Sequence, residues 1–292
     1  IYITPKCAVV GHPAGVTYSV LLPLAGNTYC VENLVSNTSS APGNNLAGSI
    51  VVSDKPVSVT VTDDSVNPIG FSPGAGCYDL MGDQIVPTDV IGTDYIINKG
   101  FLNTGSTESF FVLATENFTT VAIDDGVTPT TVILNQGDTY QFVINTGAQQ
   151  LSFVSADKNV YLLHMSGYGC ELGEAILPPL NCAGSDQVSF SRANGQSFLL
   201  DIVCPAGSEG NFTLNGSAAL VPAGAFSPVP GTAGAWMGAQ IAYNTTDVPV
   251  NSANLITNSS DLFSVGVING GSSTGCLYHY LSSFLRRVYV DA

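Results

Sequence analysis

The sequence predicts an all-β protein built from tandem β-sandwich-like units. Three observations lead to this fold class: short alternating or β-branched runs recur along the chain, each run is bounded by Gly, Pro, Asn or Asp, and no convincing long helix is found. Such runs are typical of half-buried antiparallel strands. The 31 Gly and 16 Pro among 292 residues also exclude a coiled coil.

The clearest strand patterns can be read in order along the chain. Residues 49–52 form a short β-branched run, 57–62 alternate Val with Ser or Thr, and 131–134 and 140–144 are two further apolar runs. The best helical candidate is 277–288, but its aromatic and β-branched content suits a strand as well.

Internal self-similarity predicts how these strands are grouped. Three copies of one pattern, each ending in a Gly-Cys step, occur at 53–57 with Gly76-Cys77, at 156–160 with Gly169-Cys170, and, more faintly, at 260–265 with Gly275-Cys276. The Gly-Cys steps lie 93 and 106 residues apart. A repeat of about 100 residues suits a sandwich better than a propeller blade. We therefore expect three β-rich units, at 1–101, 102–195 and 196–292.

The same motifs resemble the N-terminal domain family of the IgG Fc-binding protein, which also occurs in large secreted and surface-anchored bacterial proteins. The matching residues are 53–57 with 77–87, 156–160 with 169–179, and a closing motif at 267–278. The resemblance covers most of residues 45–285. It implies an extracellular, modular, β-rich surface protein; its motifs carry no catalytic signature and do not imply Fc binding.

The charge balance excludes several classes of partner. Seven Lys and Arg against 22 Asp and Glu leave a net charge of −15, so the chain cannot neutralise the phosphates of a nucleic acid. Anionic membrane surfaces are disfavoured for the same reason, and no apolar stretch approaches the roughly 18 to 20 residues of a membrane span. Only 10% of residues are charged, so the polar surface must be built from Ser, Thr, Asn and Gly.

Cysteine usage, low charge and N-glycosylation sequons favour a secreted, cell-surface protein. Seven Cys is an odd number, so at least one is free or pairs with another chain. Cys170 and Cys182 are the nearest pair and the first disulfide candidate, and Cys7 with Cys30 is the second, across an expected β-meander. The candidate glycosylation sites are Asn37, Asn117, Asn211, Asn215, Asn244 and Asn258.

The chemistry expected of an enzyme is missing from the sequence. His12, His164 and His279 have no partner at metal-ligand spacing, and no nucleophile elbow or phosphate-binding loop occurs. Asp63-Asp64 and Asp124-Asp125 are better explained as turn or strand-end residues than as acid/base pairs. Glu171 and Glu174 are of slightly more interest. We expect no catalysis and no metal or cofactor.

Two functions fit these features. The first is an extracellular structural protein of the cell surface or matrix that assembles into a fibre or filament, with itself or with neighbouring surface proteins, because its few charges protect its strand edges poorly. The terminal strands Ile1-Tyr2-Ile3 and Val288-Tyr289-Val290 are the expected joints. The alternative is an adhesin that recognises a glycan or a host protein through loops around Trp236 or Glu171.

Overall fold

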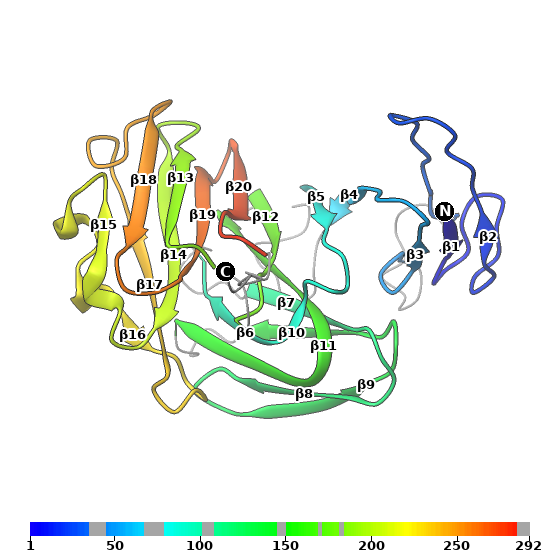
Figure 1. Cartoon of the computed structure of the whole chain (residues 1–292), viewed down its shortest axis with the longest axis horizontal. Coiled ribbons are helices and arrows are strands. Elements are labelled where there is room, and N and C mark those ends of the chain that lie inside the picture. Colours follow the sequence, from blue (N-terminus) through cyan, green and yellow to red (C-terminus); the bar gives the residue numbers. More distant parts are fainter. Residues whose placement is uncertain are drawn as a thin grey trace, which may run out of the picture.

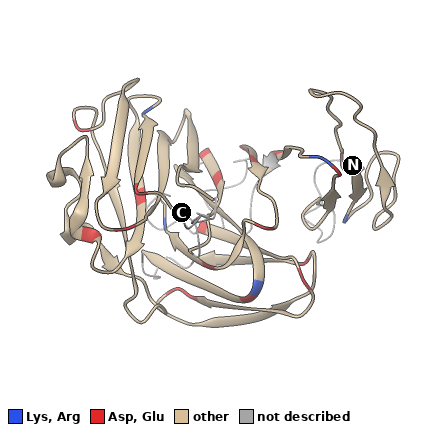
Figure 2. Cartoon of the chain, viewed as in Figure 1, with Lys and Arg blue, Asp and Glu red and all other residues tan. Residues whose placement is uncertain are grey.

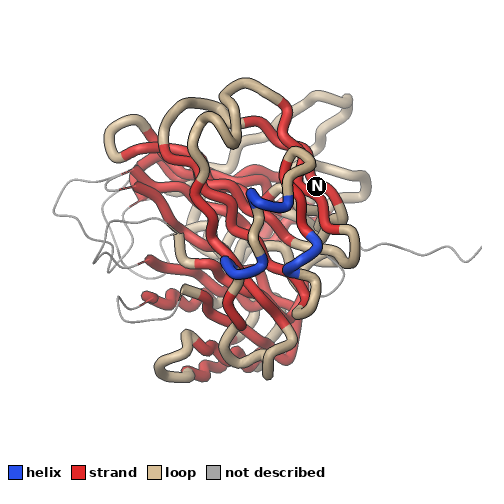
Figure 3. Tube along the Cα trace, turned by 90° about the vertical axis from the view of Figure 1, so that its left-hand side faces the viewer, coloured by secondary structure: helices blue, strands red, loops and turns tan. Residues whose placement is uncertain are grey.

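The computed structural model describes residues 1–34, 45–66, 79–100, 108–144, 150–168, 171–180 and 184–284. Strands dominate this part of the chain, and its helices are three single turns of 3-10 helix (Figure 3), so the predicted all-β class is confirmed. The 3-10 turns are η1 (Glu209–Asn211), η2 (Ala218–Leu220) and η3 (Ala223–Ala225). Residues 277–288 are the best helical candidate of the sequence, but the first of them belong to a strand, Gly275–Tyr280.

A seven-stranded antiparallel sheet forms the centre of the molecule (Figure 1). Its longest strand, β11, pairs through its first half with β6 and β8 and through its second half with β7 and β12. The register shifts between Ser155 and Val160, where β11 passes from one set of partners to the other. The strands are β6 (Gly92–Asn98), β7 (Glu108–Ala114), β8 (Thr119–Asp124), β9 (Thr130–Leu134), β10 (Thr139–Ile144), β11 (Leu151–Tyr168) and β12 (Glu171–Ile176).

Period-two alternation explains the core of this sheet. Phe110, Val112 and Ala114 of β7 are fully buried and face Val160 and Leu162 of β11 in one hydrophobic cluster. Successive strand residues point to opposite faces, so one face of each strand supplies the cluster.

The C-terminal part is a sandwich of two sheets. The three-stranded sheet β13-β18-β15 faces the five-stranded sheet β16-β17-β14-β19-β20, and Phe198, Phe212 and Phe263 lie in the cluster between them. The strands are β13 (Gln187–Ser191), β14 (Ser197–Pro205), β15 (Phe212–Leu214), β16 (Ser227–Pro228), β17 (Trp236–Ala242), β18 (Ala253–Asn258), β19 (Ser264–Gly271) and β20 (Gly275–Tyr280).

The five-stranded sheet is a middle layer that is buried on both faces. On β14, Leu200 and Ile202 pack into the C-terminal core, whereas Leu199 joins the core of the seven-stranded sheet and Val203 a smaller cluster with Leu151. This is why β14 reads as a continuous apolar run and not as an alternating one.

The N-terminal segment forms a small separate sheet and a hairpin. β1 (Tyr2–Thr4) pairs with both β2 (Tyr18–Ser19) and β3 (Ile50–Val52), and β4 (Val59–Val66) pairs with β5 (Asp79–Ile85). Lys6, just after β1, forms an ion pair of 3.5 Å with Asp138 in the turn between β9 and β10.

The sheets do not divide at the expected unit boundaries. β6, before residue 101, pairs with β11 beyond it, and β13, before residue 195, pairs with β18 beyond it. The hydrogen-bonded sheets thus cross both expected boundaries, and the three-unit repeat itself stays a prediction from the sequence.

Candidate functional site

A small groove lies where three strands from distant parts of the sequence meet. Its volume is about 160 Å³, and β5, β12 and β20 each contribute to its walls. Leu80 and Leu277 are 71% and 49% exposed, and Glu174 is half-buried. The groove is lined by Leu80, Met81, Gly82, Leu172, Gly173, Glu174, Cys276, Leu277, Tyr278 and His279.

Glycine allows two of these strands to approach closely. A Cβ on Gly173 of β12 would lie 2.7 Å from the Cβ of Tyr278 and 3.3 Å from the Sγ of Cys276, both on β20. Real Cβ atoms do not approach other carbons so closely, so a side chain at position 173 would push the two strands apart.

The third strand reaches β12 through side chains. The carboxylates of Asp79 and Asp83 on β5 accept hydrogen bonds from the backbone N–H groups of Leu172 and Ile176, at 2.6 and 2.9 Å. These N–H groups point away from β11, the strand that pairs with β12. Side chains of β5 thus pair with backbone N–H groups on the outer edge of β12, which a further strand of the sheet would otherwise have to bind.

Carboxylates dominate the electrostatics of the groove. Burial, together with the nearby negative charges of Asp83 and Asp63, raises the pKa of Glu174 to about 7. Burial also raises the pKa of the Cys276 thiol to about 12 and lowers the pKa of His279. Few cations balance these groups, because Lys and Arg are scarce over the whole described surface (Figure 2).

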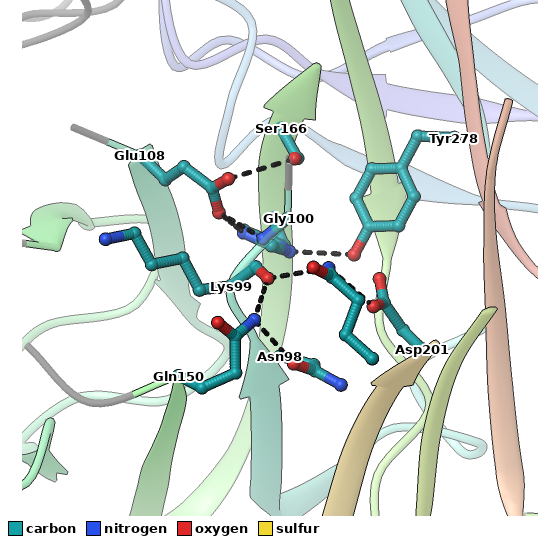
Figure 4. A network of polar contacts seen from close by, with 10 residues as sticks. Asn98, Lys99, Gly100, Glu108, Gln150, Ser166, Asp201 and Tyr278 are labelled. Carbon is teal, nitrogen blue, oxygen red and sulfur yellow. Dashed lines mark hydrogen bonds and ion pairs between the residues drawn. The ribbon is translucent and has the colours of Figure 1, made fainter. Parts of the chain in front are cut away.

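A polar network is buried behind the groove, between the seven-stranded sheet and the middle layer (Figure 4). Glu108 on β7 lies 2.9 Å from the Nε2 of His164 on β11, and the Nδ1 of His164 lies 2.7 Å from the hydroxyl of Tyr278 on β20. Ser166 donates to the other oxygen of Glu108 at 3.1 Å. With the ring proton on Nε2 and the Tyr278 hydroxyl donating to Nδ1, every polar atom of the imidazole has a partner.

The network continues to a second buried carboxyl. Asp201 on β14 is fully buried, and its Oδ1 accepts a hydrogen bond of 2.9 Å from Gln240, which also donates to the Lys99 carbonyl. Burial raises the pKa of Asp201 well above its usual range, and the charge of Glu108 acts in the same direction. This burial favours the neutral form of the carboxyl. Glu108, His164, Ser166 and Asp201 are fully buried, and the hydrogen bonds of the network join the two layers.

The structure separates the carboxylates that the sequence had placed in pairs. Glu171 and Glu174 are three residues apart on one strand, so alternation puts them on opposite faces. Asp124 and Asp125 accept the backbone N–H groups of Gly126 and of Val127 and Thr128, as expected of turn residues. Asp63 is exposed and contributes charge near Glu174.

The cysteine predictions are answered only in part. Cys7 is buried and Cys30 is exposed, and both are free thiols, so the predicted bridge between them is absent from the structure. The β-meander expected to bring them together does not form, because Cys30 lies outside any strand. Cys170 and Cys182, the first candidate pair, lie outside the described residues.

The terminal strands also differ from expectation. Tyr2 and Ile3 belong to β1, which is hydrogen-bonded on both edges, to β2 and to β3. Ile1 is tied to the same sheet through its amino group, which donates to the Val20 carbonyl. A strand paired on both edges has no free edge for a neighbouring subunit. Val288, Tyr289 and Val290 lie outside the described residues.

The described sequons differ in exposure. Asn258 is buried, and Asn37 lies outside the described residues. The remaining four are exposed: Asn117, Asn211, Asn215 and Asn244. Trp236 is half-buried and packs in the small cluster between the layers, with Leu151 and Val203.

Two further features bear on the class of site. Among the residues that the structure describes, no cluster of three or more His, Cys, Asp or Glu side chains is arranged to hold a metal. Over the same residues, none of the helices has the length and apolar character needed to cross a membrane.

The fold and groove define a class of all-β proteins in which packed sheets share a buried middle layer and present a small surface groove. The family model described as IgGFc binding protein matches residues 1–269, so the chain belongs to this family and the resemblance drawn from its motifs is confirmed. Neither the curated proteins nor the solved structures contain a match.

The residues that the sequence analysis missed are those of the buried network and the groove rim. Glu108 shares a strand face with Phe110, Val112 and Ala114, and a charged residue on an apolar face is a signal of a buried partner. The residues of the groove rim could be found only from the tertiary structure, because Leu80 and Leu277 lie almost 200 residues apart in the sequence.

Proposed function

We propose that this chain is an extracellular, non-catalytic recognition module that binds a protein partner through the β5–β12–β20 groove. One observation carries the proposal: two exposed leucines, Leu80 and Leu277, flank a half-buried carboxyl, Glu174, in a hollow at the surface. The family to which the chain belongs supports a binding role over self-assembly.

The size of the groove favours a side chain of a protein over a small molecule. Pockets for cofactors and drug-sized ligands have volumes of roughly 300 to 1,000 Å³. A hollow of about 160 Å³ is smaller than that range and matches one protruding side chain. Such single anchors, surrounded by weaker contacts, dominate the energetics of many protein interfaces.

The charge of the groove favours a basic anchor beside an apolar one. Glu174, Asp83 and Asp63 place negative charge at the hollow, and the whole chain has a net charge of −15. A Lys or Arg from the partner would pair with Glu174, while the leucines cover apolar surface next to it.

The ionisation of the groove supports a non-catalytic role. A cysteine nucleophile acts as the thiolate, and the raised pKa of Cys276 keeps it a thiol near pH 7. Burial holds the pKa of the Tyr278 phenol well above its usual range, so this hydroxyl is a poor base.

Binding measurements on the whole chain test the proposal. The family description makes the IgG Fc fragment the first probe; a panel of purified secreted proteins and a glycan array follow. We expect a protein partner whose affinity falls at least tenfold with Leu277→Ser and is unchanged with Leu255→Ser, a matched exposed leucine on β18. Equal effects of both variants, or binding to glycans alone, would refute the proposal.

A further inference from the structure

The side chains of the described sequons are held in distinct ways, which separates sites that can carry a sugar from sites that cannot. In N-glycosylation, the Asn Nδ2 displaces the lipid pyrophosphate from the anomeric carbon of a lipid-linked oligosaccharide. One N–C bond forms, one C–O bond breaks, and Nδ2 loses one of its two protons. A modified Asn must therefore point Nδ2 into solvent, with room for a bulky group.

Asn117 meets this requirement in the turn between β7 and β8. The side chain is exposed, and its Oδ1 accepts a hydrogen bond of 3.1 Å from the backbone N–H of Gln136. The Lys158 ammonium donates to the Asn117 carbonyl and holds the turn from behind. The amide is thus oriented through its oxygen, and its nitrogen donates to no group in the described part of the chain.

Asn244 has the same arrangement in the loop after β17. The side chain is exposed, and its Oδ1 accepts the backbone N–H groups of Thr246 and Asp247, at 2.7 and 3.0 Å. This Asx turn uses only the oxygen of the amide. Within the described residues, Nδ2 of Asn244 donates to nothing.

The other described sequons use their amide nitrogens within the fold. Asn258 is 4% exposed, and its Nδ2 donates to the Ser208 carbonyl at 3.0 Å. The nitrogen of Asn215 donates to Asn254 and that of Asn211 to Ser260, both at 2.9 Å. A glycan on Asn258 would have to open the packed sandwich, because the buried amide would lose its partner and its space.

We propose that Asn117 and Asn244 are the N-glycan attachment sites of the described chain, and that Asn258 is not modified. The proposal rests on the extracellular location in the proposed function. One site lies on the seven-stranded sheet and the other on the C-terminal sandwich, and neither loop contributes a residue to the groove. Glycans there would cover polar turns and leave the groove open to a partner.

Site mapping on the secreted wild-type chain tests this assignment directly. The full chain is secreted from cultured eukaryotic cells, and enzymatic removal of N-glycans in heavy-oxygen water marks each occupied Asn as a labelled Asp for mass spectrometry. We expect labels at Asn117 and Asn244 and none at Asn211, Asn215 or Asn258. An unlabelled Asn117 or Asn244, or a label at any of the other three, in the folded secreted protein would overturn the assignment.

Sequon variants separate glycan attachment from the role of the Asn side chain. Thr246→Ala removes the acceptor signal while it keeps both Asn244 and the backbone N–H that orients it. We expect the loss of one glycan with Thr246→Ala and its retention with Thr246→Ser. Retention of both glycans in Thr246→Ala would contradict the assignment of Asn244. Binding is measured on unglycosylated chain, so the proposed groove can fail or succeed independently.

Discussion

Glu174 is the side chain of the groove whose charge changes near neutral pH. Its pKa is raised from 4.5 to about 7 by burial and by the charges of Asp83 and Asp63. Burial lowers the pKa of His279, which lines the same groove and could otherwise carry a positive charge there. A carboxyl with a raised pKa in the folded state destabilises the fold as the pH rises between these two values, because the unfolded chain releases the proton first.

This pKa predicts the pH dependence of a Glu174→Gln variant. The variant lacks the titration, so its free energy of unfolding relative to wild type should rise by up to about 3 kcal/mol between about pH 4 and pH 8. Urea unfolding at a series of pH values measures it. A pH-independent difference between the two proteins would show that Glu174 titrates at its ordinary pKa. Glu171→Gln, on the opposite face of the strand, is the control.

His164 predicts a different kind of loss. Its removal, as in His164→Leu, takes one hydrogen-bond partner from the buried Glu108 and one from Tyr278, and leaving buried polar groups unsatisfied costs roughly 1 to 3 kcal/mol each. Tyr278→Phe removes one hydrogen bond and should cost about 1 kcal/mol. Thermal or urea unfolding compares them. If His164→Leu is no less stable than Tyr278→Phe, His164 does not stabilise the fold by linking Glu108 to Tyr278.

At the scale of strands, the edge of β12 is closed by two devices. Asp79 and Asp83 accept its outward N–H groups, and Gly173 lets β20 lie against it. Local pattern did not predict either device. The Asp residues appear in the sequence as an ordinary polar face of a short strand, and only the packing of β5 beside β12 shows what they bind.

The close approach at Gly173 predicts a selective effect of Gly173→Ala. The new Cβ would meet the Cβ of Tyr278 at 2.7 Å, and overpacking of this kind costs roughly 1 to 3 kcal/mol. We expect lower stability and weaker partner binding, measured by urea unfolding and by titration. Gly195→Ala is the matched control, since nothing lies within 4 Å of its added Cβ. Equal stability of both variants would show that β12 and β20 can separate without cost.

At the scale of the whole molecule, a middle layer buried on both faces joins the sheets. β14 contributes Leu200 to one core and Leu199 to the other, and Asp201 enters the network between them. The self-assembly predicted from the sequence has no support at the N-terminus, because β1 is already paired on both edges.

The net charge of −15 predicts how partner binding depends on salt. The Debye length shrinks from about 10 Å at 0.1 M salt to about 3 Å at 1 M, so long-range attraction of a basic partner is screened. We expect the association rate to fall at least tenfold over this range while the dissociation rate changes little. Surface plasmon resonance separates the two rates. A salt-independent association rate would argue for an apolar anchor alone.

The sequence by itself determined the strand class, the family, the acidic charge and the absence of familiar catalytic motifs, because these depend on residue type and spacing along the chain. Alternation carried a signal for Glu108, a charged residue on an apolar strand face, but the sequence analysis did not single it out. The tertiary structure alone decided the groove and the buried network, because their residues come from strands far apart in the sequence. It also decided which sequons point to solvent. The physical reason is that long-range pairing and burial, and not local propensity, set the neighbours and the pKa of each side chain.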